Sequence, residues 1–176
     1  MEISDRDKKR ARWAHDLFVL NIFFFHLLLT PATLVLDIGR VGMLIPLALS
    51  GMVIAFIWYR SRREGTWFVA AHWRLAFERC KLLMMGYAAS MAIFLLAELL
   101  TSGMKDAHMA NIMVTVVTRI AVMPTLIMAM VTVVMEASAG GQAAKGEVPE
   151  KIVARFPPPA GEGSIDGQGG QGAVEH

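Results

Sequence analysis

The chain has 176 residues, of which 55% are hydrophobic and only 18% charged, and its net charge is +2. Its mean hydropathy is +0.49. A soluble domain usually carries about 25% charged residues, so the composition excludes an ordinary soluble domain and indicates a small integral membrane protein. The single cysteine, Cys80, excludes a disulfide-bonded secreted scaffold, and the small net charge argues against a nucleic-acid-binding domain.

The first predicted membrane span covers residues 17–36 and follows a polar, basic N-terminal tail at residues 1–16. The span has no formal charge, and a helix of this length crosses a hydrocarbon core of about 30 Å. It is longer than the hydrophobic region of a signal peptide, and a charged Asp-Ile-Gly-Arg segment follows it in place of a cleavage site. We therefore expect a retained first span.

Three further apolar stretches follow, which predicts a membrane domain of four helices at residues 17–135. The second span is close to the first, so these two should form a tight helical hairpin. A short loop separates the third span from the fourth. The second, third and fourth spans are predicted at residues 41–59, 82–100 and 111–135.

The polar segment at residues 60–81 joins the second and third spans and is predicted to be a cytoplasmic loop. Its second part, residues 66–81, contains no proline and is too apolar for a free loop. An amphipathic helix lying at the membrane interface and bending into the third span fits this pattern. Four aromatic residues are expected at the membrane–water interface, where amphipathic rings prefer to lie: Trp58, Tyr59, Trp67 and Trp73.

The C-terminal segment at residues 136–176 is rich in glycine and proline and poor in aromatic residues. A segment of this composition has little to bury, so a disordered tail is expected.

The distribution of Lys and Arg predicts the orientation in the membrane. Five lie in the N-terminal tail, six in the 60–81 loop and three in the C-terminal segment, whereas the opposite side has Arg40 and Lys105. Cytoplasmic segments carry the excess of positive charge. Both termini are therefore predicted to be cytoplasmic, in a multi-pass protein of the inner (plasma) membrane.

Intramembrane polar residues are the first candidates for function, because they are costly in hydrocarbon. His26 is near the middle of the first span, where it is either a cofactor ligand or a histidine hydrogen-bonded inside the bundle. Glu98 and Arg119 have compatible depths in the third and fourth spans, so we expect an intramembrane ion pair. That pair is either a structural bridge or a step on a polar pathway.

One segment resembles a known family. Residues 59–67 read Tyr-Arg-Ser-Arg-Arg-Glu-Gly-Thr-Trp, and His72, Arg74 and Arg79 follow. This stretch of residues 59–79 resembles small bacterial membrane proteins related to the chloroplast Tic-type import component. The resemblance implies a small helical inner-membrane protein connected with complexes or transport, and it assigns no catalytic residue. The chain departs from that family in its fourth span and its long Gly/Pro-rich tail.

Three interpretations of function follow from the sequence. The first is a non-enzymatic accessory or scaffold subunit of a larger membrane complex. The second is a transport or permeability protein that uses Glu98, Arg119 and His26. The third is a haem- or quinone-linked redox subunit that acts through His26. We expect no catalytic residues, no metal site and no bound cofactor. The expected partners are the lipid bilayer and either another membrane protein or a second copy, but no nucleic acid.

Overall fold

The structure is a computed structural model, and it describes residues 3–36, 42, 44–63 and 65–159. These residues form helices and connecting turns, and they contain no strand. Four helical segments are long and apolar enough to cross a membrane: Asp5–Thr33, Leu44–Ser61, Trp67–Thr101 and Ala107–Lys145. The prediction of an all-helical protein with four candidate spans is therefore confirmed.

The first segment starts well before its predicted span. Helix α1 (Asp5–Asn21) begins in the basic tail, where the Ser4 side chain accepts a hydrogen bond from the Asp7 backbone N–H. Such an N-cap satisfies a donor that the first turn leaves open. The chain continues through the π-helix η1 (Ile22–Leu29) into α2 (Thr30–Val35). Pro31 lies directly after the π-helix. Because proline has no backbone N–H, one backbone hydrogen bond of a regular α-helix is missing at this position.

The second and third segments differ from the prediction between residues 66 and 81. Helix α3 (Leu44–Ser61) matches the second predicted span, and α4 runs without interruption over Trp67–Thr101. The first turns of α4 belong to the same helix as the third span and contain many buried residues, among them Trp67, Phe68 and Trp73. The apolar side chains that indicated an interfacial helix are thus packed inside the protein.

The fourth segment is divided at Val122. Helix α5 (Ala107–Ala121) starts with an N-cap from Asp106, and α6 (Met123–Lys145) has Pro124 in its first turn. Helix α6 extends ten residues beyond the predicted span, and a short helix α7 (Glu150–Arg155) follows. The prediction of a disordered tail is wrong for residues 136–159, because small residues allow this part of α6 to pack against α1. Residues 160–176, where the rest of the predicted tail lies, are outside the described part of the chain.

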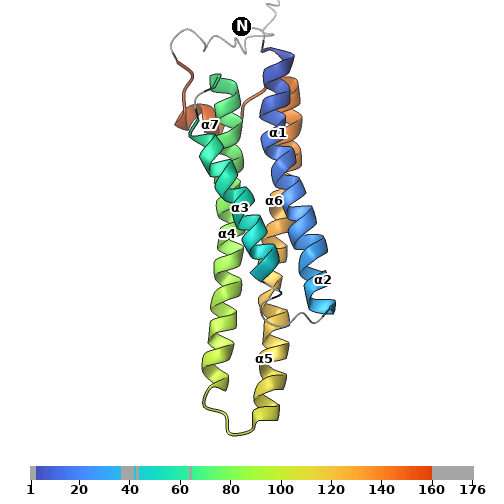
Figure 1. Cartoon of the computed structure of the whole chain (residues 1–176). Coiled ribbons are helices and arrows are strands. Elements are labelled where there is room, and N and C mark those ends of the chain that lie inside the picture. Colours follow the sequence, from blue (N-terminus) through green and yellow to red (C-terminus); the bar gives the residue numbers. More distant parts are fainter. Residues whose placement is uncertain (1–2, 37–41, 43, 64, 160–176) are drawn as a thin grey trace, which may run out of the picture.

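The helices form an elongated bundle (Figure 1). Helix α1 begins at the same end as α7, and the α4–α5 turn lies at the opposite end, beyond the ends of α2 and α3. The main contacts join α4 with α6, α1 with α6, α4 with α5, and α1 with α4. Most of the buried side chains belong to the α1–α7 end, so the tightest core lies among helix segments outside the predicted spans.

Candidate functional site

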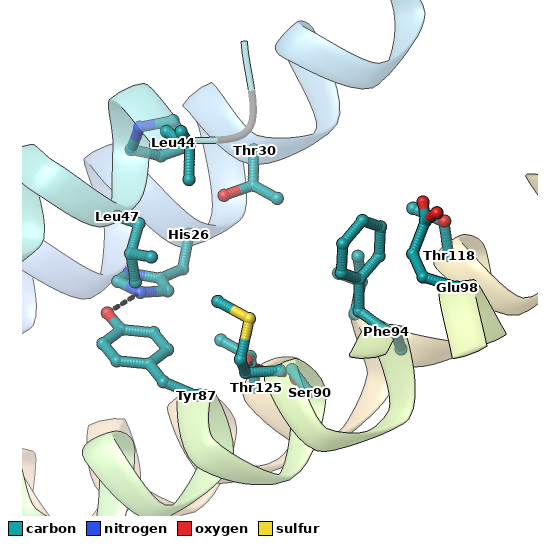
Figure 2. A pocket seen from close by; sticks show the side chains of 14 residues that line it. His26, Thr30, Leu44, Leu47, Tyr87, Ser90, Phe94, Glu98, Thr118 and Thr125 are labelled. Atoms are coloured by element: carbon teal, nitrogen blue, oxygen red, sulfur yellow. Dashed lines mark hydrogen bonds between the residues drawn. The ribbon is translucent and has the colours of Figure 1, made fainter. Parts of the chain in front are cut away.

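A cavity of about 440 Å³ lies between η1, α2, α3, α4, α5 and the start of α6. The described residues that line it all belong to the predicted membrane spans, and the surface that they present to the cavity is mainly apolar. The volume is in the range of small-molecule sites, which are typically about 300–1,000 Å³ and mainly apolar with a few convergent polar groups. We call this cavity the intramembrane pocket; Figure 2 shows its lining side chains.

His26 and Tyr87 form one end of the intramembrane pocket (Figure 2). His26 Nε2 is hydrogen-bonded to the Tyr87 hydroxyl, and the two rings are stacked with their centroids 5.4 Å apart. The Tyr87 hydroxyl is also 2.8 Å from Ser50 Oγ, so three helical segments meet at this group. His26 belongs to the π-helix η1, a helix type that occurs frequently at functional sites.

A second polar pair lines the intramembrane pocket one turn further along α4. Ser90 Oγ and Thr125 Oγ1 are 2.8 Å apart, which joins α4 to α6. We call these two side chains the hydroxyl pair. Each hydroxyl has one hydrogen, and only one of the two hydrogens is used in the contact between them.

The predicted residues Glu98 and Arg119 have different surroundings. Glu98 is half-buried and lies at the end of the intramembrane pocket opposite His26 (Figure 2). Arg119 is exposed on α5. The pairing of Glu98 with Arg119 stays a prediction.

The four predicted interface aromatics fall into two classes. Trp58 and Tyr59 are exposed at the end of α3, where Arg62 lies 4.2 Å from the Trp58 ring centroid and Arg63 lies 4.4 Å from that of Tyr59. Trp67 and Trp73 are buried instead. The Trp67 indole N–H donates to the Phe156 carbonyl, because a buried indole needs an acceptor and α7 brings one close.

A buried polar cluster, which the sequence did not reveal, lies toward the α1–α7 end of the bundle. Its members are His15, His72, Arg79 and Glu136. Glu136 is fully buried; its Oε2 atom is 2.6 Å from His15 Nδ1, and its Oε1 atom accepts from Arg79 at 3.3 Å. His15 Nε2 is 2.9 Å from His72 Nδ1, and His72 Nε2 is 3.0 Å from the Glu147 carbonyl oxygen.

The hydrogen-bond pattern of this cluster determines where its protons lie. A carbonyl only accepts, so His72 Nε2 must carry a hydrogen and donate it to Glu147. In a neutral His72, Nδ1 is then an acceptor, and His15 Nε2 donates to it. The remaining proton lies between His15 Nδ1 and the Glu136 carboxyl group. The cluster is thus a continuous chain of hydrogen bonds that connects α1, α4, α6 and the segment before α7.

The two sites offer different chemistry. The buried polar cluster is a set of charged and hydrogen-bonded groups inside a core. The intramembrane pocket is an apolar space with a few polar groups. Within the part of the chain that the structure describes, no group of three or more His, Cys, Asp or Glu side chains is arranged to hold a metal ion.

Comparison of the chain with protein-family models, with curated proteins and with solved structures finds no match. The resemblance of residues 59–79 to Tic-like membrane proteins therefore stays a prediction.

Proposed function

We propose that this chain is a non-enzymatic accessory subunit of a larger complex in the inner (plasma) membrane, with both termini in the cytoplasm. In this orientation the α1–α7 end of the bundle extends into the cytoplasm, and Trp67–Lys81 of α4 lies at and above the membrane surface. The excess of Lys and Arg in the N-terminal tail, the 60–81 segment and the C-terminal segment supports a cytoplasmic position for these three segments.

The observation that carries the accessory role is the polar face of α5. Asn111, Thr115 and Arg119 are spaced four residues apart, so they lie on one face of the helix, and all three are exposed. Arg119 lies eight residues into its predicted span, which is about 12 Å along the helix axis. An arginine at that depth is costly when it faces lipid. A neighbouring transmembrane helix that covers this face would remove the cost.

The chemistry of this face favours a partner other than a second copy. Two copies related by a two-fold axis through this face would bring their Arg119 side chains toward each other, and like charges in a low-dielectric environment repel strongly. A transmembrane helix of another protein that carries a carboxylate would neutralise Arg119. We therefore place a different membrane protein, with an acidic side chain at the matching depth, against α5.

Transport is the second candidate. Asn21 is buried between the intramembrane pocket and the buried polar cluster, and its amide has no hydrogen-bond partner among the described residues, which is in favour of a polar connection. Three fully buried apolar side chains argue against such a connection, because they lie between the two sites along these helices: Phe18 on α1, Ile22 at the start of η1 and Leu83 on α4. This apolar layer makes transport the less supported interpretation.

The test is purification of the C-terminally tagged full chain from its native host in a mild detergent. We expect a stoichiometric membrane-protein partner with the wild type. Arg119→Met should lose this partner, because it keeps the side-chain length and removes the charge. Lys105→Met is the matched control, since Lys105 is an exposed cation in the α4–α5 turn, and it should keep the partner.

Three results would contradict the proposal. If the wild-type protein purifies without a partner, the accessory role is excluded. A partner that Arg119→Met retains would show that α5 is not the contact. A Soret band in the visible spectrum of the purified wild type would favour the redox interpretation instead.

A further inference from the structure

We infer that the buried polar cluster is a proton-binding site, which in the folded chain holds one proton that the separated side chains give up in neutral to alkaline solution. The proton is shared along the hydrogen bonds that run from Glu136 through His15 to His72. This inference goes beyond the accessory role and is independent of the polar face of α5.

Three close contacts determine how many hydrogens the cluster needs. His15 Nδ1 is 2.6 Å from Glu136 Oε2, and His15 Nε2 is 2.9 Å from His72 Nδ1. His72 Nε2 is 3.0 Å from the Glu147 carbonyl oxygen. All three distances are those of hydrogen bonds, whereas two lone pairs that face each other at such distances repel. Each contact therefore contains one hydrogen, which makes three in the cluster.

An ionised Glu136 and two neutral histidines supply only two of these hydrogens. A carboxylate has none, and a neutral imidazole carries one. The third hydrogen is therefore an added proton. A second added proton would place two hydrogens in one contact, where they would repel. The geometry thus matches one added proton and no other number.

The added proton has three alternative positions in the cluster. It can lie on Glu136, on His15 or on His72, and in each case the other hydrogens rearrange so that all three hydrogen bonds remain. These side chains are 0–1% exposed, so water does not compete for their hydrogen bonds. Chains of hydrogen bonds strengthen one another in such a low-dielectric interior.

The charges around the cluster are compatible with one added proton. Glu136 bridges His15 and Arg79 with its two oxygens, so its negative charge lies between the two cationic groups. Cys80 on α4 is a buried thiol, and apolar burial keeps a thiol neutral. Among the described residues, the next charged side chains along the packed elements are exposed or paired elsewhere: Arg12 and Asp16 on α1, Arg74, Glu78 and Lys81 on α4, Lys145 on α6, and Glu147 before α7.

The added proton makes the stability of the fold depend on pH. In an unfolded chain a histidine loses its proton at about pH 6.5 and a glutamate at about pH 4.3. Above the histidine value, the folded state binds one proton more than the unfolded state, so stability falls as the pH rises until the cluster releases its proton. Between the two values the unfolded state binds more protons, so stability falls as the pH is lowered. Stability is therefore expected to be greatest near pH 6.5.

The test measures reversible unfolding of the full chain by SDS in mixed detergent micelles at about pH 7, 8 and 9. The unfolding equilibrium constant of the wild type should rise about tenfold per pH unit, which is the dependence for one proton. This rise should end where the folded cluster releases its proton.

Glu136→Gln is the decisive variant, because an amide supplies the hydrogen that a carboxylate lacks. Its amide N–H can donate to His15 Nδ1 while its oxygen accepts from Arg79, so all three hydrogen bonds form without an added proton. The unfolding constant of this variant should therefore not change with pH over the same range, whatever its absolute stability. Glu78→Gln is the matched control, since it makes the same chemical change in the exposed bridge to Arg155 and should keep the wild-type pH dependence.

A direct count of hydrogens decides the question if Glu136→Gln fails to fold. Nitrogen-15 NMR of the histidine-labelled protein at about pH 8, above the usual titration of histidine, distinguishes protonated from bare ring nitrogens. Of the four ring nitrogens of His15 and His72, three should be protonated. If only two are, a carboxylic acid band in the infrared spectrum that Glu98→Gln retains should show the proton on Glu136. Substitution by glutamine removes the signals of the other three histidines: His26, His108 and His176.

Three outcomes would overturn the inference. Wild-type unfolding that does not depend on pH over this range would exclude an added proton. The same dependence in the wild type and in a folded Glu136→Gln variant would place the proton outside the cluster. Two protonated ring nitrogens together with an ionised Glu136 would show that one contact lacks its hydrogen. Partner recovery through Arg119 is measured separately, so failure of this inference leaves the accessory role intact.

Discussion

Glu136 is the residue on which the buried polar cluster depends. Its carboxyl group is fully buried, shares a hydrogen bond with His15 on α1 and accepts one from Arg79 on α4. A buried charge is stable only when partners replace its hydration. Removal of this carboxyl group leaves the largely buried Arg79 without its counter-ion and His15 Nδ1 without its partner. Both losses act on the packing of α1 against α4 and α6.

The Glu136→Ala variant is therefore expected to be strongly destabilised, by about 3–5 kcal/mol, which is the usual cost of breaking a buried ion pair from one side. The measurement is thermal unfolding in detergent. Glu78→Ala is the matched control, because Glu78 pairs with Arg155 at 3.2 Å in an exposed bridge, whose loss should cost less than about 1 kcal/mol. Equal losses for the two variants would contradict the structural role of the cluster.

At the scale of elements, Gly86 determines how closely α4 approaches the start of α6. A Cβ atom at this position would lie 3.0 Å from Cβ of Met128 and 3.2 Å from the Pro124 carbonyl oxygen. The backbone of Pro124 cannot rotate away from such a contact. The two helices therefore need a residue without a side chain here, as small residues commonly provide at helix contacts in membranes.

Gly86→Ala is expected to destabilise the protein by about 1–3 kcal/mol, the usual cost of overpacking. Gly51→Ala is the control, since α3 leaves open space around Gly51 and a Cβ would meet nothing within 4 Å. This second change should leave the melting temperature unchanged or slightly higher, because alanine favours a helix over glycine. A Gly86→Ala protein as stable as the wild type would mean that α4 and α6 are further apart.

The spans were predictable from the sequence because long apolar runs have few alternatives in a membrane. The helix at residues 136–145 was missed, and Gly140 shows why. The glycine- and alanine-rich run near it reads as a flexible tail, yet Ala139 and Ala143 are fully buried and a Cβ at Gly140 would lie 3.7 Å from Cβ of His15. Small residues allow this close packing only when α1 is present, and a local pattern does not contain that information.

The candidate sites could also be predicted only in part from the sequence. His26 was identifiable as a polar group inside an apolar span, whereas its partner Tyr87 is 61 residues away and reads as an ordinary aromatic residue. The buried polar cluster joins His15 to residues 57 and 121 positions away. His15 in the predicted N-terminal tail and His72 in the predicted interfacial helix gave no sign of burial, because neither segment was expected to pack inside the bundle. Only the packing of α1, α4 and α6 brings these side chains together.

At the scale of the whole molecule, the bundle has two parts with different surroundings. At the α1–α7 end, the helices pack around an apolar core and enclose the buried polar cluster. At the α4–α5 end, large apolar side chains such as Leu95, Leu99 and Met109 are exposed, as expected for a surface that faces lipid. This contrast, together with the excess of Lys and Arg toward the α1–α7 end, predicts which end is cytoplasmic.

Cysteine labelling with a membrane-impermeant maleimide tests this orientation. Ser102→Cys lies exposed in the α4–α5 turn and should react from the outside of spheroplasts, whereas Lys151→Cys lies exposed on α7 and should react only after permeabilisation. The wild type gives the background, because Cys80 is buried. The reverse pattern would invert the orientation, since the basic segments would then face outward. Labelling of both positions on the same side would contradict the crossing of the membrane by α4, because this helix alone separates the two ends of the bundle by about 50 Å at 1.5 Å per residue.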